Sequence, residues 1–246
     1  MKKSLITLMF LGSFIYGQGE NKNSLYMENY INTVIVGTSE KLEFYDTIIT
    51  YPKIYSVVRD ENIYQLNNLI REDAIKVIKW YESYNDEDTI ENLDLNIKFE
   101  IVLLNKNLVS IEYYGLGELE GAAHPDKIFY TTNIDLNTLK KLKLKDIINV
   151  NKDFVEYFLK NFKYIGPLGD EDVGKNISKE FGDSEYLLKS FLEADSVGES
   201  SVYSYFTKKG LVITVPVNHA IGGYAELELD YKTLYKYLKP SIKKYF

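Results

Sequence analysis

The spacing of hydrophobic and polar positions changes several times along the chain. The most regular helical pattern begins at Asn62, an expected N-cap with Gln65 three residues further on. Apolar side chains recur on one helical face at Ile63, Leu66, Leu69, Ile70, Ala74, Val77, Ile78 and Tyr81. This period predicts an amphipathic helix that packs on a core.

Other stretches alternate with the period of strands. Pro52 interrupts a β-rich stretch at 42–58, which suits an edge strand or a bulge, and residues 20–40 give no clear prediction. Strands are predicted at 93–103, 109–113, 127–134, 202–207, 211–217 and 225–231, and shorter helices at 152–163, 184–194 and 232–239. Because strands and helices come in blocks, we expect an α+β fold, with a mainly antiparallel sheet packed against helices in a single compact domain.

The N-terminus has the pattern of a signal peptide. Lys2 and Lys3 precede an apolar run at 5–16, and small residues follow at 17–19. The run is shorter than the roughly 20 residues of a bilayer span, and the absence of Cys excludes a bacterial lipid anchor. The alternative is a buried N-terminal strand or helix. We expect cleavage of residues 1–19 and export to the periplasm or beyond the cell, with no transmembrane helix in the mature chain.

The charge balance narrows the class of partner. The chain carries 29 Lys and Arg against 36 Asp and Glu, a formal charge of -7, and only Arg59 and Arg71 are arginines. Loss of Lys2 and Lys3 with the signal peptide would leave -9. This acid excess argues against a nucleic-acid partner. With 0 Cys, no disulfide, thiolate metal site or cysteine nucleophile can form, and we expect no cofactor.

Apparent nucleotide motifs lack essential residues. Residues 169–176 approach a P-loop, but Asn176 replaces the hydroxyl residue that binds magnesium, and three acids stand where phosphates would lie. Gly115, Gly117 and Gly121 miss the dinucleotide-binding spacing. These stretches are expected to be ordinary loops.

His124 lies among small residues between two predicted strands. It could serve as a metal ligand or general base beside Glu118, Glu120 or Asp126, and His219 could join it in a zinc site. The preferred interpretation is a structural histidine whose ring nitrogens bind backbone groups of a tightly packed loop. We therefore expect no catalytic residue and no metal.

A second loop, Pro216–Tyr224, is the candidate for ligand binding. It joins two predicted strands, ends in an aromatic side chain, and contains two consecutive glycines that permit close approach of a ligand. The candidate binding residues are Pro216, His219, Gly222, Gly223 and Tyr224. The alternative is a plain hairpin turn.

Several motifs occur in the order found in one family. These are Tyr51-Pro52-Lys53-Ile54, Leu66-Asn67-Asn68-Leu69-Ile70, Ser110-Ile111 with Tyr113, Gly121-Ala122-Ala123-His124-Pro125, residues 133–138, residues 142–148, and the closing stretches 206–215 and 223–231. Together they resemble an exported bacterial family of unknown function. It is typified by the outer region of the RsiV anti-sigma factor and the N-terminal part of PdaC-type peptidoglycan deacetylases.

This resemblance implies an α+β fold, export and a role in the cell envelope; one branch of the family binds lysozyme as a signal. Residues 20–145 are similar to the PdaC N-terminal region and residues 146–246 to the RsiV C-terminal region, as one interlocked domain. The deacetylase activity belongs to a separate metal domain that this sequence does not contain.

The expected function is a non-enzymatic, exported binding module. Its ligand would be a basic, lysozyme-type muramidase or a peptidoglycan-related molecule, and its acidic charge suits the first. The alternatives are a purely structural envelope protein, and a cell-wall hydrolase or metal-dependent enzyme that uses His124 with a nearby carboxylate.

Overall fold

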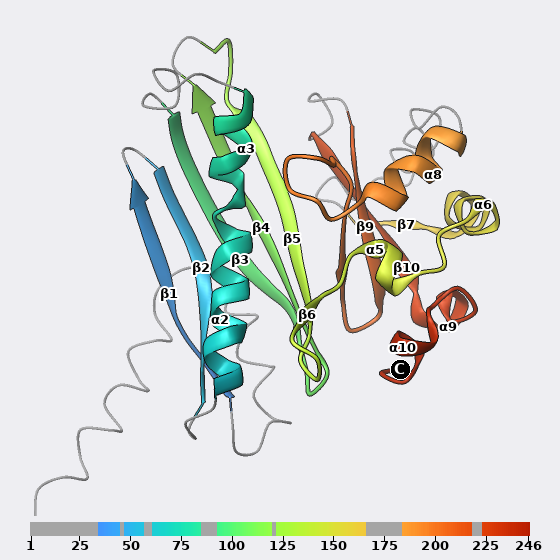
Figure 1. Cartoon of the computed structure of the whole chain (residues 1–246). Helices are drawn as coiled ribbons and strands as arrows, with labels where there is room; N and C mark the ends of the chain where they lie inside the picture. The colour runs from blue at the N-terminus through green and yellow to red at the C-terminus, as the bar shows by residue number, and fades with distance from the viewer. Residues whose placement is uncertain are drawn as a thin grey trace, which may run out of the picture.

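The chain forms two β-sheets with helices packed against them (Figure 1). The computed structural model describes residues 34–44, 47–56, 61–84, 93–119, 122–165, 184–217 and 223–246. The first sheet has six strands in chain order: β1 (Val34–Phe44), β2 (Thr47–Ser56), β3 (Leu93–Leu104), β4 (Leu108–Leu119), β5 (Asp126–Asp135) and β6 (Lys140–Lys141). All neighbours are antiparallel except β2 and β3, which pair in parallel.

Two helices, α2 (Glu61–Ala74) and α3 (Lys76–Tyr84), cover one face of this sheet (Figure 1). The predicted apolar face is confirmed, since Leu66, Ile70 and Val77 are buried against the strands. The prediction of one helix beginning after Asn62 is wrong, because α2 starts at Glu61 and the helix breaks at Ile75.

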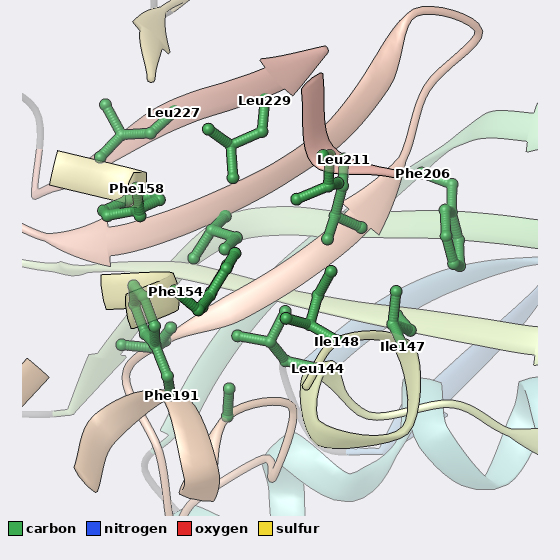
Figure 2. Close-up of a cluster of buried hydrophobic side chains, with 14 of the residues drawn as sticks. Leu144, Ile147, Ile148, Phe154, Phe158, Phe191, Phe206, Leu211, Leu227 and Leu229 are labelled. Atoms are coloured by element: carbon green, nitrogen blue, oxygen red, sulfur yellow. The ribbon is translucent and has the colours of Figure 1, made fainter. Parts of the chain in front are cut away.

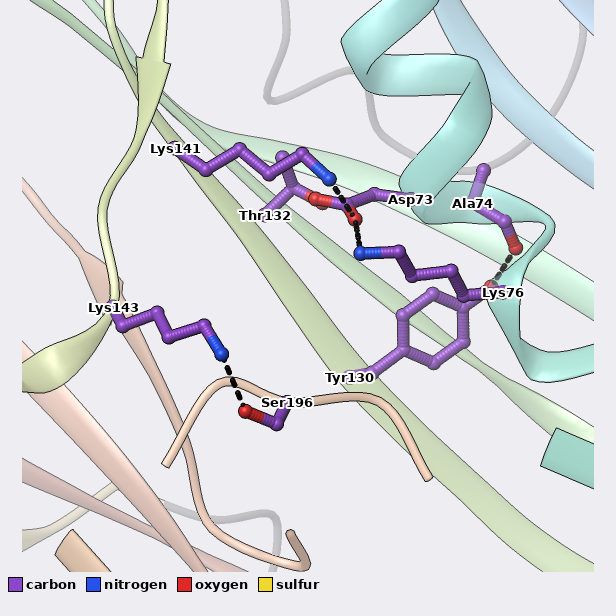
Figure 3. A network of polar contacts seen from close by, with 8 residues as sticks. All are labelled: Asp73, Ala74, Lys76, Tyr130, Thr132, Lys141, Lys143 and Ser196. Atoms are coloured by element: carbon purple, nitrogen blue, oxygen red, sulfur yellow. Dashed lines mark hydrogen bonds and ion pairs between the residues drawn. The ribbon is translucent and has the colours of Figure 1, made fainter. Parts of the chain in front are cut away.

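Polar contacts fix this break to the sheet (Figure 3). The Tyr130 hydroxyl on β5 donates to the Ala74 carbonyl at 2.5 Å. The buried Asp73 carboxylate accepts from Thr132 at 3.0 Å and lies 2.5 Å from the amine of Lys141 and 2.8 Å from that of Lys76. The end of α2 is thus bound to β5 and β6 by side-chain contacts.

The second sheet has four antiparallel strands in the order β7-β10-β9-β8. They are β7 (Lys163–Tyr164), β8 (Tyr203–Phe206), β9 (Gly210–Pro216) and β10 (Tyr224–Asp230). The helices of this half are α5 (Leu144–Ile147), α6 (Lys152–Asn161), α8 (Ser184–Glu193), α9 (Tyr231–Leu234) and α10 (Pro240–Lys243).

An aromatic and aliphatic core lies between this sheet and its helices (Figure 2). Phe154 and Phe158 from α6 meet Phe191 from α8, with ring centroids 5.9 and 5.0 Å from that of Phe191. Leu211 and Leu227 close the core from the strands. The predicted helices at 152–163 and 184–194 are therefore confirmed with shorter bounds.

The predicted helix at 232–239 is wrong. Of these residues only 232–234 are helical, in α9, and Leu238 instead forms an isolated β-bridge with Ile148. The Lys239 amide donates to the Ile147 carbonyl at 2.9 Å, and Pro240 disfavours helical dihedral angles at Lys239.

Pro52 does not lie on an edge strand, because β1 forms outside it and takes in residues 34–40, for which the sequence gives no prediction. The alternative of a bulge is supported: Pro52 pairs with Ser39 at the point where the β1–β2 register shifts. A proline is tolerated there because a bulge already interrupts the ladder.

The two sheets join through polar side chains along the free edge of β8, which we call the seam. It consists of Ser110, Thr131, Asn133, Asp195 and Ser204. Thr131 and Asn133 each donate to the Ser204 carbonyl at 2.7 Å, and the Phe206 amide donates to the Ser110 hydroxyl at 2.9 Å. The backbone groups of an edge strand are thus satisfied by side chains of the other sheet.

The observed architecture confirms the α+β class, with sheets that are mainly antiparallel and packed on helices. Among the described residues, no helix has the length and apolar character required to span a bilayer.

Candidate functional site

A groove of about 580 Å³ opens where the two sheets meet. Its walls come from the first half of α3, the start of β5, residues 197–201, and the facing ends of β9 and β10. This volume is in the range of small-ligand sites, which often form at junctions between structural units.

Aromatic side chains make one wall of the groove. Phe129 on β5 lies at the centre, with its ring centroid 4.5 Å from Tyr224 on β10 and 6.4 Å from Tyr203 on β8. Residues alternate along β5, so Tyr130 points to the helices, whereas Phe129 and Thr131 point to the second sheet. The alternation of side chains along β5 therefore places the Phe129 ring between the two sheets.

The opposite wall is the segment 197–201, which follows α8. Gly198 has a φ of 83°, and a Cβ atom at this position would lie 2.7 Å from Cδ1 of Trp80. Only glycine suits this left-handed conformation and this close approach. The backbone therefore lies directly against Trp80, the one tryptophan of the chain, which also lines the groove.

The seam holds this wall in place. The Asp195 carboxylate accepts from the Ser204 amide at 2.6 Å, from the Ser204 hydroxyl at 2.7 Å and from the Leu144 amide at 2.6 Å. At the next residue of the chain, the Ser196 hydroxyl accepts from the Lys143 amine at 2.7 Å (Figure 3). Residues 195 and 196 are thus anchored to α5 and β8 immediately before the groove wall begins.

Burial and neighbouring charges determine the protonation of two groups in this region. Burial raises the pKa of Asp195 to about 6, although the hydrogen bonds from Ser204 and Leu144 oppose this shift. Burial, and next the charge of Glu226, raise the pKa of Tyr224 to about 12. Tyr224 therefore presents a neutral ring and hydroxyl to the groove at neutral pH.

Polar groups surround the aromatic wall. Asp126, Lys127, Glu199 and Ser201 are exposed and line the groove. The Tyr81 hydroxyl donates to the Asp126 carboxylate at 3.4 Å, at the start of β5. Rings flanked by carboxylates, an amine and a hydroxyl provide stacking surfaces and hydrogen-bonding groups for an amphiphilic ligand.

The structure brings three of the five candidate binding residues to this groove. Pro216, Gly223 and Tyr224 line it, and Gly223 has a φ of 85°, which favours glycine. His219 and Gly222 lie outside the described residues.

His124 is exposed, as are its neighbours from Ala122 to Lys127. The described residues around His124 are therefore exposed rather than tightly packed, and the structural role of this histidine stays a prediction. His124 is not among the residues that line the groove. Within the described part of the chain, no group of three or more His, Asp and Glu side chains could hold a metal ion.

Sequence reasoning missed most of the groove. Trp80 lies beside the apolar face of its helix, Phe129 is one position in an ordinary strand, and residues 197–201 lack regular structure. Two signals were available in the sequence. Trp80 is a large aromatic residue outside the apolar face of its helix, and Gly198 is a glycine in a polar segment that follows a helix.

Comparisons with known proteins find distant similarity. No family model matches the sequence, and no curated protein matches it. A solved structure of a DUF3298 family member from Bacteroides fragilis has a TM-score of 0.48 and 14% identity, covering 85% of this chain and 95% of that chain. A DUF3298 family protein from Pseudomonas aeruginosa has a TM-score of 0.47 and 12% identity, with the same coverage. Identities this low assign no function to this chain.

Proposed function

We propose that this protein is an exported, non-enzymatic binding module of the bacterial cell envelope, and that the groove between its two sheets is the binding site. The observation that carries the proposal is the aromatic wall of Phe129, Tyr203 and Tyr224 in a groove of about 580 Å³. Loops at the end of a rigid sheet are common positions for recognition.

The groove is suited to a peptidoglycan-related ligand. The apolar faces of sugar rings stack on aromatic side chains, and their hydroxyl and amide groups need acceptors and donors close to the rings. Asp126 and Glu199 supply acceptors, Ser201 supplies a hydroxyl, and Lys127 supplies an amine. Since Tyr224 keeps its proton at neutral pH, its hydroxyl can donate as well.

A lysozyme-type muramidase is the second candidate ligand. The formal charge is -7 for the whole chain, and removal of Lys2 and Lys3 with a signal peptide would make it more negative. An acidic protein attracts basic partners over long distances, and this attraction weakens as salt is added. The RsiV-like motifs suggest the same class of partner.

Isothermal titration calorimetry with two probes tests the proposal. The probes are a soluble peptidoglycan disaccharide-peptide and a basic lysozyme, each titrated at low and at high salt. We expect one of them to bind with a Kd of about 1 μM or tighter, which corresponds to about -8 kcal/mol. Salt should weaken lysozyme binding much more than binding of the peptidoglycan fragment.

A matched pair of variants locates the binding. Tyr224→Ala removes part of the aromatic wall and should weaken binding about tenfold. Tyr64→Ala makes the same change at a side chain on α2 that is 73% exposed and does not line the groove, so its affinity should match that of the unmodified protein. Absence of binding to both probes at low salt, or equal losses in both variants, would contradict the proposal.

A further inference from the structure

The lysines are distributed unevenly in this acidic protein. Four segments, at 105–107, 136–140, 207–209 and 231–246, contain no Asp or Glu. They contribute nine lysines: Lys106, Lys140, Lys208, Lys209, Lys232, Lys236, Lys239, Lys243 and Lys244. The acid excess of the chain as a whole therefore conceals a strongly basic region.

Specific contacts bring these four segments together. The Tyr231 amide donates to the Lys209 carbonyl at 3.2 Å, and the Leu136 amide donates to the Asn107 carbonyl at 2.8 Å. The Asn137 side chain donates to the Tyr245 hydroxyl at 3.3 Å. Figure 1 shows α9 and α10 toward the same end of the molecule as the turn between β5 and β6. We call the surface formed by these segments the lysine face.

Aromatic rings order several of the amines. The Lys236 amine lies 4.7 Å from the ring centroid of Tyr237, and the Lys243 amine lies 5.0 Å from that of Tyr235. Such cation–π contacts reduce the freedom that the long side chains would lose on binding. Tyr235 and Phe246 are 48% and 44% exposed, so the face presents rings as well as cations to solvent.

Several acidic side chains lie next to this face and contact neighbouring groups. Asp135 accepts from the Tyr245 hydroxyl at 2.7 Å, and Asp230 accepts from the Lys232 amide at 2.8 Å as the N-cap of α9. On α6, the exposed Glu156 lies 3.7 Å from the amine of Lys160. Hydrogen bonds from neutral groups do not cancel the charges of Asp135 and Asp230, but the nine lysines outnumber these two flanking acids and leave the face with a net positive charge.

We propose that the lysine face docks the protein on the surface of an anionic phospholipid bilayer. Clustered lysines are attracted to anionic headgroups, and exposed Tyr and Phe rings partition into the headgroup region. A nucleic acid is less well matched, because base reading relies on arginine and these segments contain none.

The proposed docking is compatible with an open groove but does not depend on its function. The groove lies at the Asp126 end of β5, whereas the contacts of Asp135 and Asn137 with Tyr245 lie at the other end. Ten residues of strand separate these ends by about 30 Å. A protein held by its lysine face would present the groove away from the bilayer.

Sedimentation with vesicles tests the docking. The purified protein is mixed with vesicles of phosphatidylcholine alone, or of phosphatidylcholine and phosphatidylglycerol in equal amounts. We expect partition onto the anionic vesicles only, with a steep loss on addition of salt. The double variant K232E/K236E should lower the partition coefficient at least about tenfold. K79E/K189E reverses two exposed lysines elsewhere and should leave most of the partition intact.

A second arm separates a bilayer from a soluble polyanion. Tyr235→Ala should weaken binding to anionic vesicles severalfold but leave binding to duplex DNA or polyphosphate unchanged, because only a bilayer offers an apolar boundary for the ring. Thermal melting confirms that each variant is folded. The proposal is overturned if anionic vesicles do not bind at low salt, if both double variants lose partition equally, or if Tyr235→Ala has no effect on vesicles.

Discussion

The hydrophobic cores and the polar seam differ in their chemistry and in their contributions to stability and geometry. The structure has two apolar cores, one built mainly from the first half with side chains such as Ile70 and Ile97, the other mainly from the second half with Phe154 and Phe158. Leu108 of β4 also packs in the second core. The seam between the sheets is polar and is held by directional hydrogen bonds to the edge of β8. Apolar burial is not directional, whereas hydrogen bonds fix geometry. We infer that the cores supply most of the stability and that the seam sets the position of the groove walls.

The largest expected effect is a loss of stability from the second core. Phe154 is fully buried, and its ring lies 5.4 Å from that of Tyr237 as well as beside Phe191. Phe154→Ala should lower the free energy of unfolding by about 3–5 kcal/mol, because it removes apolar contact and leaves a cavity. Urea denaturation measures this loss. Tyr186→Ala, at a side chain that is 64% exposed, is the control and should cost less than about 0.5 kcal/mol. Similar losses in the two variants would refute this role of the core.

The second effect is a pH dependence of the folding stability that arises from Asp195 in the seam. The raised pKa of Asp195, about 6 instead of 3.8, means that the folded state holds the proton more tightly than the unfolded state. This contribution to stability is complete below about pH 4 and is lost as the pH rises to about 6; its size is about 3 kcal/mol.

Asp195→Asn removes that titration. The difference in unfolding free energy between the unmodified protein and the variant should therefore be larger at pH 4 than at pH 7, by about 2–3 kcal/mol. Urea denaturation at several pH values measures it. A difference that increases with pH over this range would show instead that the folded state favours the ionised carboxylate.

The third effect is smaller and concerns one hydrogen bond of the seam. Ser110 is fully buried, accepts from the Phe206 amide and donates to the Asn133 side chain. Ser110→Ala should lower the free energy of unfolding by about 1–3 kcal/mol, because it leaves buried polar groups without partners. Thermal melts of both variants measure the loss. Ser190→Ala, at a hydroxyl that donates to the Tyr186 carbonyl of its own helix at the surface, should have little effect. A stability loss for Ser110→Ala no larger than this control would mean that the seam tolerates the missing contact.

Much of the fold could be predicted from the sequence, because the regular elements have clear periods. The alternation of Leu93, Leu95 and Ile97, and the apolar face that includes Ile70 and Val77, identify β3 and the helical layer directly. The break at Ile75 could not be foreseen, because the hydroxyl that binds the Ala74 carbonyl there comes from β5, 56 positions away in the chain.

The candidate site could be predicted only in part. Gly223 and Tyr224 stand out locally as a glycine and an aromatic residue between strands. Trp80 and Phe129 come from the first half and Gly198 from the second, so the groove that they line forms only where the two halves meet, and no local pattern encodes that contact. The lysine face was also missed, because the net charge of -7 describes the whole chain and does not show that nine lysines are clustered.

The fluorescence of Trp80 tests the central claim most directly. This side chain is the one tryptophan of the chain and lines the groove, so its emission reports occupancy at the proposed site. A titration with the soluble peptidoglycan fragment or with a tryptophan-free basic muramidase variant should change the emission of Trp80 and reach saturation. The midpoint should shift to about tenfold higher concentration in Tyr224→Ala and stay the same in Tyr64→Ala. Binding detected by calorimetry without any change in the emission of Trp80, or an unaltered midpoint in Tyr224→Ala, would contradict the assignment of the groove as the binding site.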